Sequence, residues 1–283
     1  MTSFQIVESV FDGHRSIVLQ SPDVVLEILR DAGPRIISFS APGGRNLFAW
    51  TPNTSWETVH GRPYRLLGGH RLWSAPECPQ PEQPPDDIPV DIEIEDDAAV
   101  VSGGALTHEG LERSLRIAPI DGRTAVTVTH TLSNPGPQAR TVAAWALTQL
   151  APGGRATIPH EPGSPEAQQL PNRNIVLWPY TSWDDPRLEI DDNEVRVAAD
   201  EEIDAPCKVG SFVSAGSAWY ELGGCRFTKR FNALPDLPHA DLATNVQVYS
   251  CSEFLELETL GPLETLRPGE SVRHEEQWEL TTT

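Results

Sequence analysis

Alternation of apolar and polar residues with a period of two dominates this chain, and the 3.6-residue period of amphipathic helices is nearly absent. Because successive side chains of a strand point to opposite faces of a sheet, the pattern predicts an antiparallel all-β protein. The predicted strands are Val24–Leu29, Arg35–Ser40, Val90–Asp96, Ala98–Ser102, Arg113–Pro119, Thr124–Leu132, Thr141–Leu150, Arg226–Phe231, Asn245–Ser250, Phe254–Thr259 and Val272–Leu280.

Turn signals separate these segments. Asp121-Gly122 between two alternating runs is the strongest short-range hairpin signal in the sequence. Two stretches predict long loops instead: Cys78–Pro89 contains five prolines, and His160–Arg173 is rich in Pro, Gly and Gln. No interdomain linker or internal repeat interrupts the pattern, so we expect residues 1–283 to form one large β-sandwich domain.

Composition narrows the range of partners. The 283 residues include 41 Asp and Glu against 21 Lys and Arg, a formal net charge of −20 that repels nucleic acids and anionic membrane surfaces. We see no signal peptide at the N-terminus and no apolar run of membrane-spanning length. The four cysteines lack metal-binding spacing, which indicates reduced thiols and a cytoplasmic protein without a metal. No cofactor motif is present, and the oligomeric state is not predicted.

The segment Leu67–Glu77 is the densest group of candidate site residues. It contains an acid/base in His70, a fork-shaped donor in Arg71, an aromatic face in Trp73 and a carboxylate in Glu77. Sugar sites combine such groups, because aromatic rings cover the C–H face of a sugar while charged groups bind its hydroxyls. The alternative is a structural loop that buries Trp73 and pairs Arg71 with Glu77.

A second group follows from strand alternation near the C-terminus. Asn245, Gln247 and Tyr249 share one face of a predicted strand, and Glu256 and Glu258 share one face of the next. The two strands predict a polar face with two carboxylates, or alternatively a solvated outer sheet face.

Two weaker candidates complete the set. The aromatic and turn-rich segment Trp178–Arg187 suits a cleft wall or a packed loop, with Arg187 as a ligand donor. Lys229 lies between aromatic residues and either binds a ligand or extends along the surface.

These residues resemble motifs of the galactose mutarotase-like superfamily, over most of the chain. Gly43–Phe48 resembles the end of its opening hairpin, and Gly69–Arg71 resembles the element that places a histidine in the sugar cleft. Leu257–Thr259 is similar to the late strand that carries the catalytic glutamate, and Pro268–Glu270 to the closing turn. Further motifs, such as Gly-Gly-His-Arg-Leu-Trp and Leu-Glu-Thr-Leu-Gly-Pro, resemble a bacterial branch of this superfamily.

The resemblance implies a large β-sandwich with a concave sugar-binding face and aldose 1-epimerase chemistry. Glu258 is then the general base and His70 the general acid, since the central strand offers Trp145 where mutarotases carry a second histidine. The substrate is a small-molecule carbohydrate, bound by the residues Arg71, Trp73, Glu77, Trp145, Arg187, Lys229, Asn245, Gln247, Tyr249 and Glu256.

Two alternatives stay open. The missing central histidine favours a sugar-binding or regulatory protein that has lost the chemistry. The carboxylates Glu77, Glu256 and Glu258 favour a carbohydrate hydrolase or lyase on the same fold. The sequence leaves open whether the sugar is neutral or acidic, because Arg35, Arg71, Arg187 and Lys229 are available to pair with an anion.

Overall fold

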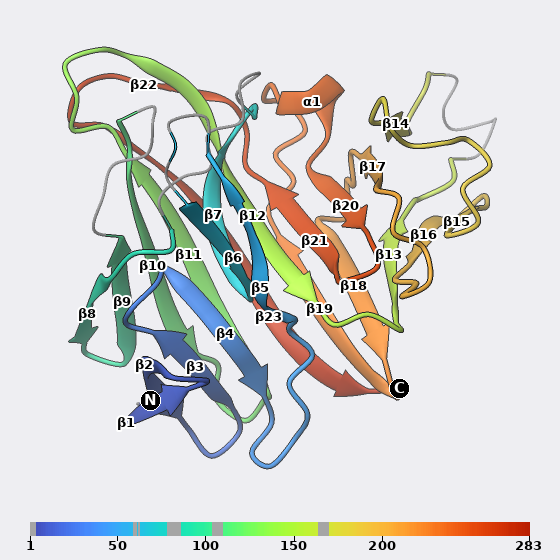
Figure 1. Cartoon of the computed structure of the whole chain (residues 1–283). Coiled ribbons are helices and arrows are strands. Elements are labelled where there is room, and N and C mark those ends of the chain that lie inside the picture. Colours follow the sequence, from blue (N-terminus) through green and yellow to red (C-terminus); the bar gives the residue numbers. More distant parts are fainter. Residues whose placement is uncertain (1–3, 59–60, 62, 78–85, 104–109, 164–169) are drawn as a thin grey trace.

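Two large antiparallel sheets form the body of the protein. The computed structural model describes residues 4–58, 61, 63–77, 86–103, 110–163 and 170–283 (Figure 1). The first sheet has the spatial order β1 (Gln5–Phe11), β2 (His14–Gln20), β3 (Val25–Leu29), β4 (Arg35–Ser40), β7 (His70–Ala75), β12 (Arg140–Leu150), β21 (Leu255–Leu260), β20 (Val246–Ser250), β17 (Cys207–Ser211) and β14 (Val176–Leu177), and β22 (Glu264–Leu266) pairs with β12.

The second sheet lies against one face of the first. Its spatial order is β15 (Leu188–Ile190), β16 (Glu194–Ala198), β13 (Arg155–Pro159), β18 (Ser217–Leu222), β19 (Cys225–Phe231), β23 (Ser271–Thr282), β11 (Ala125–Ser133), β10 (Glu112–Pro119), β9 (Ala98–Gly103) and β8 (Val90–Glu95). The remaining elements are the two-stranded sheet β5 (Trp50–Glu57) and β6 (Pro63–Gly68) and the short segment α1 (Ala240–Ala243).

Alternation along the strands builds the core between the two sheets. Val246, Val248 and Leu257 of the first sheet are fully buried there, together with Val128 and Trp278 of the second. The residues between them in sequence therefore point to the outer face of the first sheet, which is turned away from the second. A smaller apolar cluster lies on that outer face, where β6 packs on β7 and β12.

The predicted all-β sandwich is confirmed, and each of the predicted strands occurs within two residues of its expected bounds. Asp121-Gly122 does connect the antiparallel pair β10 and β11. The alternative of a structural loop for the segment Leu67–Glu77 does not hold, because His70–Ala75 forms the central strand β7 between β4 and β12. Residues 78–85 and 164–169 of the two predicted long loops lie outside the described residues.

Three of the four cysteines, Cys207, Cys225 and Cys251, are free thiols, and Cys78 lies outside the described residues. No helix in the described ranges has the length and apolar character needed to span a membrane.

Candidate functional site

The outer face of the first sheet carries a hollow of about 410 Å³ over β7, β12, β21, β20 and β17. This volume is within the range of small-molecule sites, roughly 300–1,000 Å³. Six aromatic side chains line it together with four carboxylates and two cations. The lining residues used below are Trp56, Arg71, Trp73, Glu77, Trp145, Gln149, Tyr180, Asp204, Lys208, Tyr249, Glu253, Phe254 and Glu256.

Strand register explains why these side chains converge. Arg71, Leu147, Glu258 and Gln247 stand opposite one another across four neighbouring strands. A second row of cross-strand neighbours contains Gln149, Glu256, Tyr249 and Lys208, and a third begins with Trp73 and Trp145. The predicted polar face of the two late strands is thus confirmed, and it adjoins the face of β7 that carries Arg71.

Glu258 lies at the base of this face and is fully buried. Its Oε2 atom accepts hydrogen bonds from Trp145 Nε1 at 2.7 Å and from Lys208 Nζ at 2.9 Å, whereas its Oε1 atom has no partner. Burial raises the pKa of Glu258 to about 7, with Lys208 opposing the rise and Glu256 adding to it. A carboxyl group with such a pKa exchanges protons near neutral pH.

Arg71 is held from two sides. Its Nη2 atom donates to Glu256 at 2.7 Å, and its Nε atom lies 3.8 Å from Asp86. The pairing of Arg71 with Glu77, which belongs to the alternative structural-loop interpretation, is therefore not found in the described structure. Asp86 is fully buried and also accepts from Tyr64 and from Trp73 Nε1, each at 2.8 Å, so it fixes the wall on which Arg71 and Trp73 stand.

Several buried polar atoms of this face lack a hydrogen-bond partner. They include Nε and Nη1 of Arg71, both amide atoms of Gln149, and the side-chain oxygen of Gln247. A buried polar group without a partner costs roughly 1–3 kcal/mol, so native proteins seldom keep one without a use. Arg71 and Gln149 line the hollow, and Gln247 and Oε1 of Glu258 belong to the same face of the sheet, an arrangement that suits a hydroxyl-rich ligand.

A strained backbone segment lies beside Gln247 of this sheet face. Asp241, Leu242 and Ala243 have φ angles of 50°, 59° and 64°, in the left-handed region that costs an L-residue roughly 1–2 kcal/mol. Gln247 Nε2 donates to Asp241 at 2.8 Å, and Asn174 Nδ2 donates to two carbonyls of the segment. Such strain concentrates at functional sites, where neighbouring groups hold it in place.

His70 lies on the opposite side of the sheet from this hollow. It is fully buried between the two sheets, where its Nε2 atom is 2.7 Å from His130 Nε2 and its Nδ1 atom 2.8 Å from Thr148 Oγ1. The predicted position of His70 beside Glu258 is therefore wrong. Neighbouring residues of a strand point in opposite directions, and Arg71, not His70, faces the hollow.

Lys229 belongs to the same interior network. Its Nζ atom is 3.0 Å from Glu276 and donates to the carbonyl of Ala146, with both charged side chains fully buried. Glu276 also accepts from Thr259 at 2.5 Å and from Trp278 Nε1 at 2.7 Å. The predicted role of Lys229 in the cleft is wrong, because its charge is used in the core.

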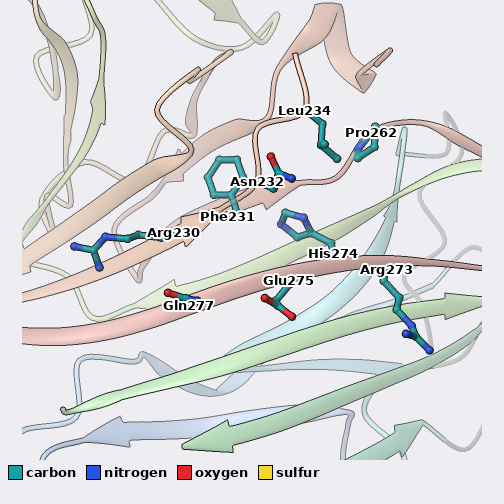
Figure 2. Close-up of a pocket in the computed structure, with 9 residues that line it drawn as sticks. All are labelled: Arg230, Phe231, Asn232, Leu234, Pro262, Arg273, His274, Glu275 and Gln277. Atoms are coloured by element: carbon teal, nitrogen blue, oxygen red, sulfur yellow. The ribbon is translucent and has the colours of Figure 1, made fainter. Parts of the chain in front are cut away.

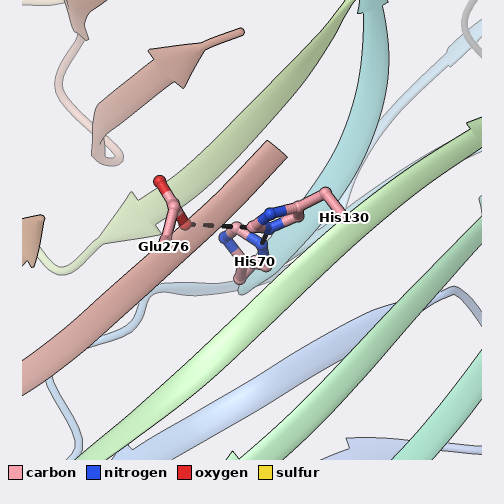
Figure 3. A group of neighbouring side chains, drawn as sticks. All are labelled: His70, His130 and Glu276. Carbon is pink, nitrogen blue, oxygen red and sulfur yellow. Dashed lines mark hydrogen bonds and ion pairs between the residues drawn. The ribbon is translucent and has the colours of Figure 1, made fainter. Parts of the chain in front are cut away.

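Figure 3 shows the three members of this network that approach one another closely enough to share a metal ion, His70, His130 and Glu276. The hydrogen bonds of the two histidines already use the nitrogen lone pairs that a metal ion would need. His130 Nδ1 donates to the carbonyl of His274 at 2.9 Å, so its Nε2 atom accepts from His70, whose Nδ1 atom accepts from Thr148. The two imidazoles are thus neutral and satisfied, and with Lys229 beside Glu276 the group does not fit a cation.

Two further predicted ligand residues serve local structure. Arg187 donates to both carboxylate oxygens of Asp185 and to the carbonyls of Ser250 and Ala205. Asn245 is fully buried and bonds both the amide and the carbonyl of Val213. Neither Arg187 nor Asn245 lines the hollow, so their expected positions in the cleft are wrong.

A second hollow, of about 550 Å³, lies over β19 and β23 (Figure 2). Arg273, Glu275 and Gln277 of β23 alternate on the exposed face there, and Arg230 is paired with Glu279. None of the buried polar atoms without a partner in the described ranges belongs to it, so the hollow over β7, β12 and β21 is the candidate site.

Several residues of this site were not predicted from the sequence. Lys208, Gln149, Trp56 and Asp86 all lie in the hollow or in its wall. Lys208 alternates with Cys207 and Val209, but a run of five residues is too short for the alternation to predict the strand. Trp56 and Asp86 gave no sequence signal, because Trp56 reaches the site from the separate β5–β6 hairpin and Asp86 from the proline-rich stretch.

Comparison with known proteins agrees with this geometry at the level of the fold. No protein-family model and no curated protein sequence matches the chain. Two large antiparallel sheets with a hollow on the outer face of one define a class of large β-sandwich. Solved structures assign that class, and the chain has the galactose mutarotase-like fold.

Three solved structures represent the likeness. A galactose mutarotase-like protein from Lactobacillus casei has a TM-score of 0.59 at 11% identity, covering 94% of this chain and 100% of that one. A galactose mutarotase related enzyme from Lactobacillus acidophilus has a TM-score of 0.52 at 8% identity, covering 95% and 98%. A TPR-domain containing protein from Parabacteroides distasonis has a TM-score of 0.62 at 17% identity over 95% of this chain, which spans 47% of that longer protein.

Proposed function

We propose that the protein is an aldose 1-epimerase-like enzyme that binds an uncharged sugar in the hollow and uses Glu258 as general base. The observation that carries this proposal is the environment of Glu258. The carboxyl group is buried, has a pKa of about 7, and keeps one oxygen without a partner. The likeness of the fold to galactose mutarotase-like proteins supports the same chemistry.

The aromatic lining supports a sugar as the ligand. Trp56, Trp145 and Tyr180 give the hollow apolar surfaces on which the C–H face of a pyranose packs. Arg71 and Gln149 add unpartnered donors and an acceptor for the hydroxyl groups. A general base then opens the ring by removing the proton of the anomeric hydroxyl, a step worth about 10²–10⁴ in rate.

Charge supports an uncharged sugar over an acidic or phosphorylated one. Each of the four basic residues that the sequence offered to an anion is paired with a carboxylate in the described structure, whereas Glu77, Asp204 and Glu253 line the hollow without an ion-pair partner. A phosphate would meet an excess of negative charge there. The four pairs are Arg35 with Asp86, Arg71 with Glu256, Arg187 with Asp185, and Lys229 with Glu276.

A second candidate is a sugar-binding protein without catalysis. It is favoured by the bonding of Glu258 Oε2 to both Trp145 and Lys208, and by the lack of any histidine lining the hollow in the described part of the chain. The hydrolase alternative is less well supported, because Glu256 is engaged by Arg71.

The test is anomeric exchange followed by proton NMR over a panel of neutral, acidic and phosphorylated sugars. We expect faster exchange for at least one neutral sugar and none for phosphorylated ones. Glu258→Gln keeps the size of the side chain and should slow exchange by at least ~100-fold while the protein stays folded.

The matched control is Glu275→Gln, the same change on the exposed face of β23, which should leave exchange unaltered. Exchange that survives in Glu258→Gln would remove Glu258 as the base. Saturation transfer to a sugar without faster exchange would select the binding protein instead.

A further inference from the structure

Ring opening needs a proton donor for the ring oxygen as well as a base, and His70 lies in the core. Several other side chains that line the hollow carry an ionisable proton. Burial raises the pKa of Tyr180 and of Tyr249, which makes both phenols poor acids, and the guanidinium of Arg71 does not release a proton. Among the other ionisable side chains that line the hollow in the described structure, Lys208 is hydrogen-bonded to Glu258.

We propose that Lys208 is the general acid of the site and works as a pair with Glu258. This inference rests on the proposed epimerase function. Lys208 lines the hollow, is 5% exposed, and places Nζ 2.9 Å from Glu258 Oε2.

The surroundings of Lys208 fix its ammonium group. Nζ lies 4.7 Å from the ring centre of Trp145 and 4.8 Å from that of Trp178, a cation–π arrangement on two sides. Its backbone is fixed as well, because the Lys208 amide donates to Thr181 Oγ1 at 2.7 Å and its carbonyl accepts from the same hydroxyl at 2.8 Å. A side chain used only for charge balance would not need this degree of positioning.

The proton transfers balance. The Glu258 carboxylate takes the proton of the anomeric hydroxyl, C1=O1 forms, and the C1–O5 bond breaks with its electron pair on O5, which takes a proton from Lys208. Rotation about C1–C2 and the reverse steps close the ring with inverted C1. The neutral amine and the carboxylic acid left by ring opening share a hydrogen bond, so a proton can also pass directly from Glu258 to Lys208 and restore the pair.

Glu77 is the rival donor. Burial raises the pKa of its carboxyl group, with Lys208 opposing and Glu256 adding to the rise. However, Glu77 is exposed at the end of β7 and has no hydrogen bond to Glu258 in the described structure. Lys208 therefore holds the better position.

The experiment compares Lys208→Arg, Lys208→Ala and Lys208→Met in the NMR exchange assay, with the neutral sugar that the wild-type protein accelerates. Arginine keeps the positive charge beside Glu258 but does not give up a proton at neutral pH. We expect each variant to lose at least ~100-fold in exchange rate. Added ethylammonium should restore exchange in Lys208→Ala, which leaves room for it, and not in Lys208→Met, which fills the space.

Lys208→Arg with near wild-type exchange would overturn the inference, since charge alone would then suffice. Lack of rescue of a folded Lys208→Ala protein by ethylammonium would also count against it. The outcomes separate the two proposals. If Glu258→Gln retains exchange, the proposed function fails; if only Glu258→Gln loses exchange and the Lys208 variants keep it, the Lys208 role alone fails.

Discussion

Several side chains that line the hollow are buried and have polar atoms without a hydrogen-bond partner. Gln149 is fully buried, yet neither its amide oxygen nor its amide nitrogen forms a hydrogen bond. Arg71, one row away on β7, has two side-chain nitrogens, Nε and Nη1, without a hydrogen-bond partner. Such groups lower the stability of the free protein, and the hydroxyls of the proposed sugar ligand would satisfy them, which is the usual trade between stability and function.

Gln149→Leu should therefore raise stability and weaken sugar binding at the same time. Removing two unsatisfied polar atoms should increase the free energy of unfolding by about 1 kcal/mol, and losing the hydroxyl contacts should weaken binding by roughly 10-fold. Urea unfolding and a saturation-transfer titration measure the two effects. Gln247→Leu is the matched control, and it should lower stability because Gln247 Nε2 bonds Asp241 and Thr244.

Residue-scale reasoning from the sequence found Arg71, Trp73, Glu256 and Glu258 but misplaced His70. The error has a physical cause. The two glycines at 68 and 69 favour a loop, and in a loop adjacent side chains can both reach a ligand. In the strand that actually begins at His70, the period of two sends His70 and Arg71 to opposite faces.

At the scale of strands, turn signals and alternation were enough to predict most of the two sheets. The site was harder, because β17 enters it from a distant part of the chain and its five residues give little periodicity. Lys208 and Glu258 are 50 residues apart in sequence, and only the pairing of β17 with β20 and of β20 with β21 brings them together. Strand order is not encoded in local pattern, so Lys208 was missed.

The interior network ties strands of both sheets and yields a prediction about stability. Glu276→Gln leaves the Lys229 ammonium buried without a carboxylate, so it should lower the free energy of unfolding by roughly 3–5 kcal/mol. The double variant Lys229→Met with Glu276→Gln removes the isolated charge and should recover much of the loss. Chemical denaturation of the three proteins measures this, and a loss well below ~1 kcal/mol in the single variant would contradict a charged pair.

For the whole molecule, the fold was predictable because composition, turns and alternation agree over the entire chain. The interior histidines were not predictable. His130 on β11 and His274 on β23 lie directly opposite each other. Each alternates along its strand with polar residues such as threonine and glutamate, and this pattern equally describes an exposed face. Only the packing of the second sheet on the first turns them inward, and this has a consequence for the behaviour of the protein in acid.

Stability should fall as the pH is lowered from neutrality. Burial lowers the pKa of His70, of His130 and of His274, the last to about 3, so each stays neutral when folded and binds a proton below its ordinary value of 6.5 when unfolded. The unfolded chain therefore binds more protons, and the free energy of unfolding decreases with falling pH. At about pH 5.5 the loss from His274, whose folded pKa of about 3 lies well below that pH, is about 1.4 kcal/mol, and His70 and His130 act in the same direction.

Glu258 acts in the opposite direction. Its folded pKa of about 7 lies above its ordinary value of 4.5, so the folded protein gains a proton first and recovers roughly 2 kcal/mol at about pH 5.5. Between about pH 7.5 and pH 5.5 the wild-type protein should thus lose stability, and Glu258→Gln, which lacks the offset, should lose roughly 2 kcal/mol more. Urea unfolding at the two pH values tests both. Equal losses in the two proteins would mean that Glu258 has an ordinary pKa, which would also remove the main support for its role as the base.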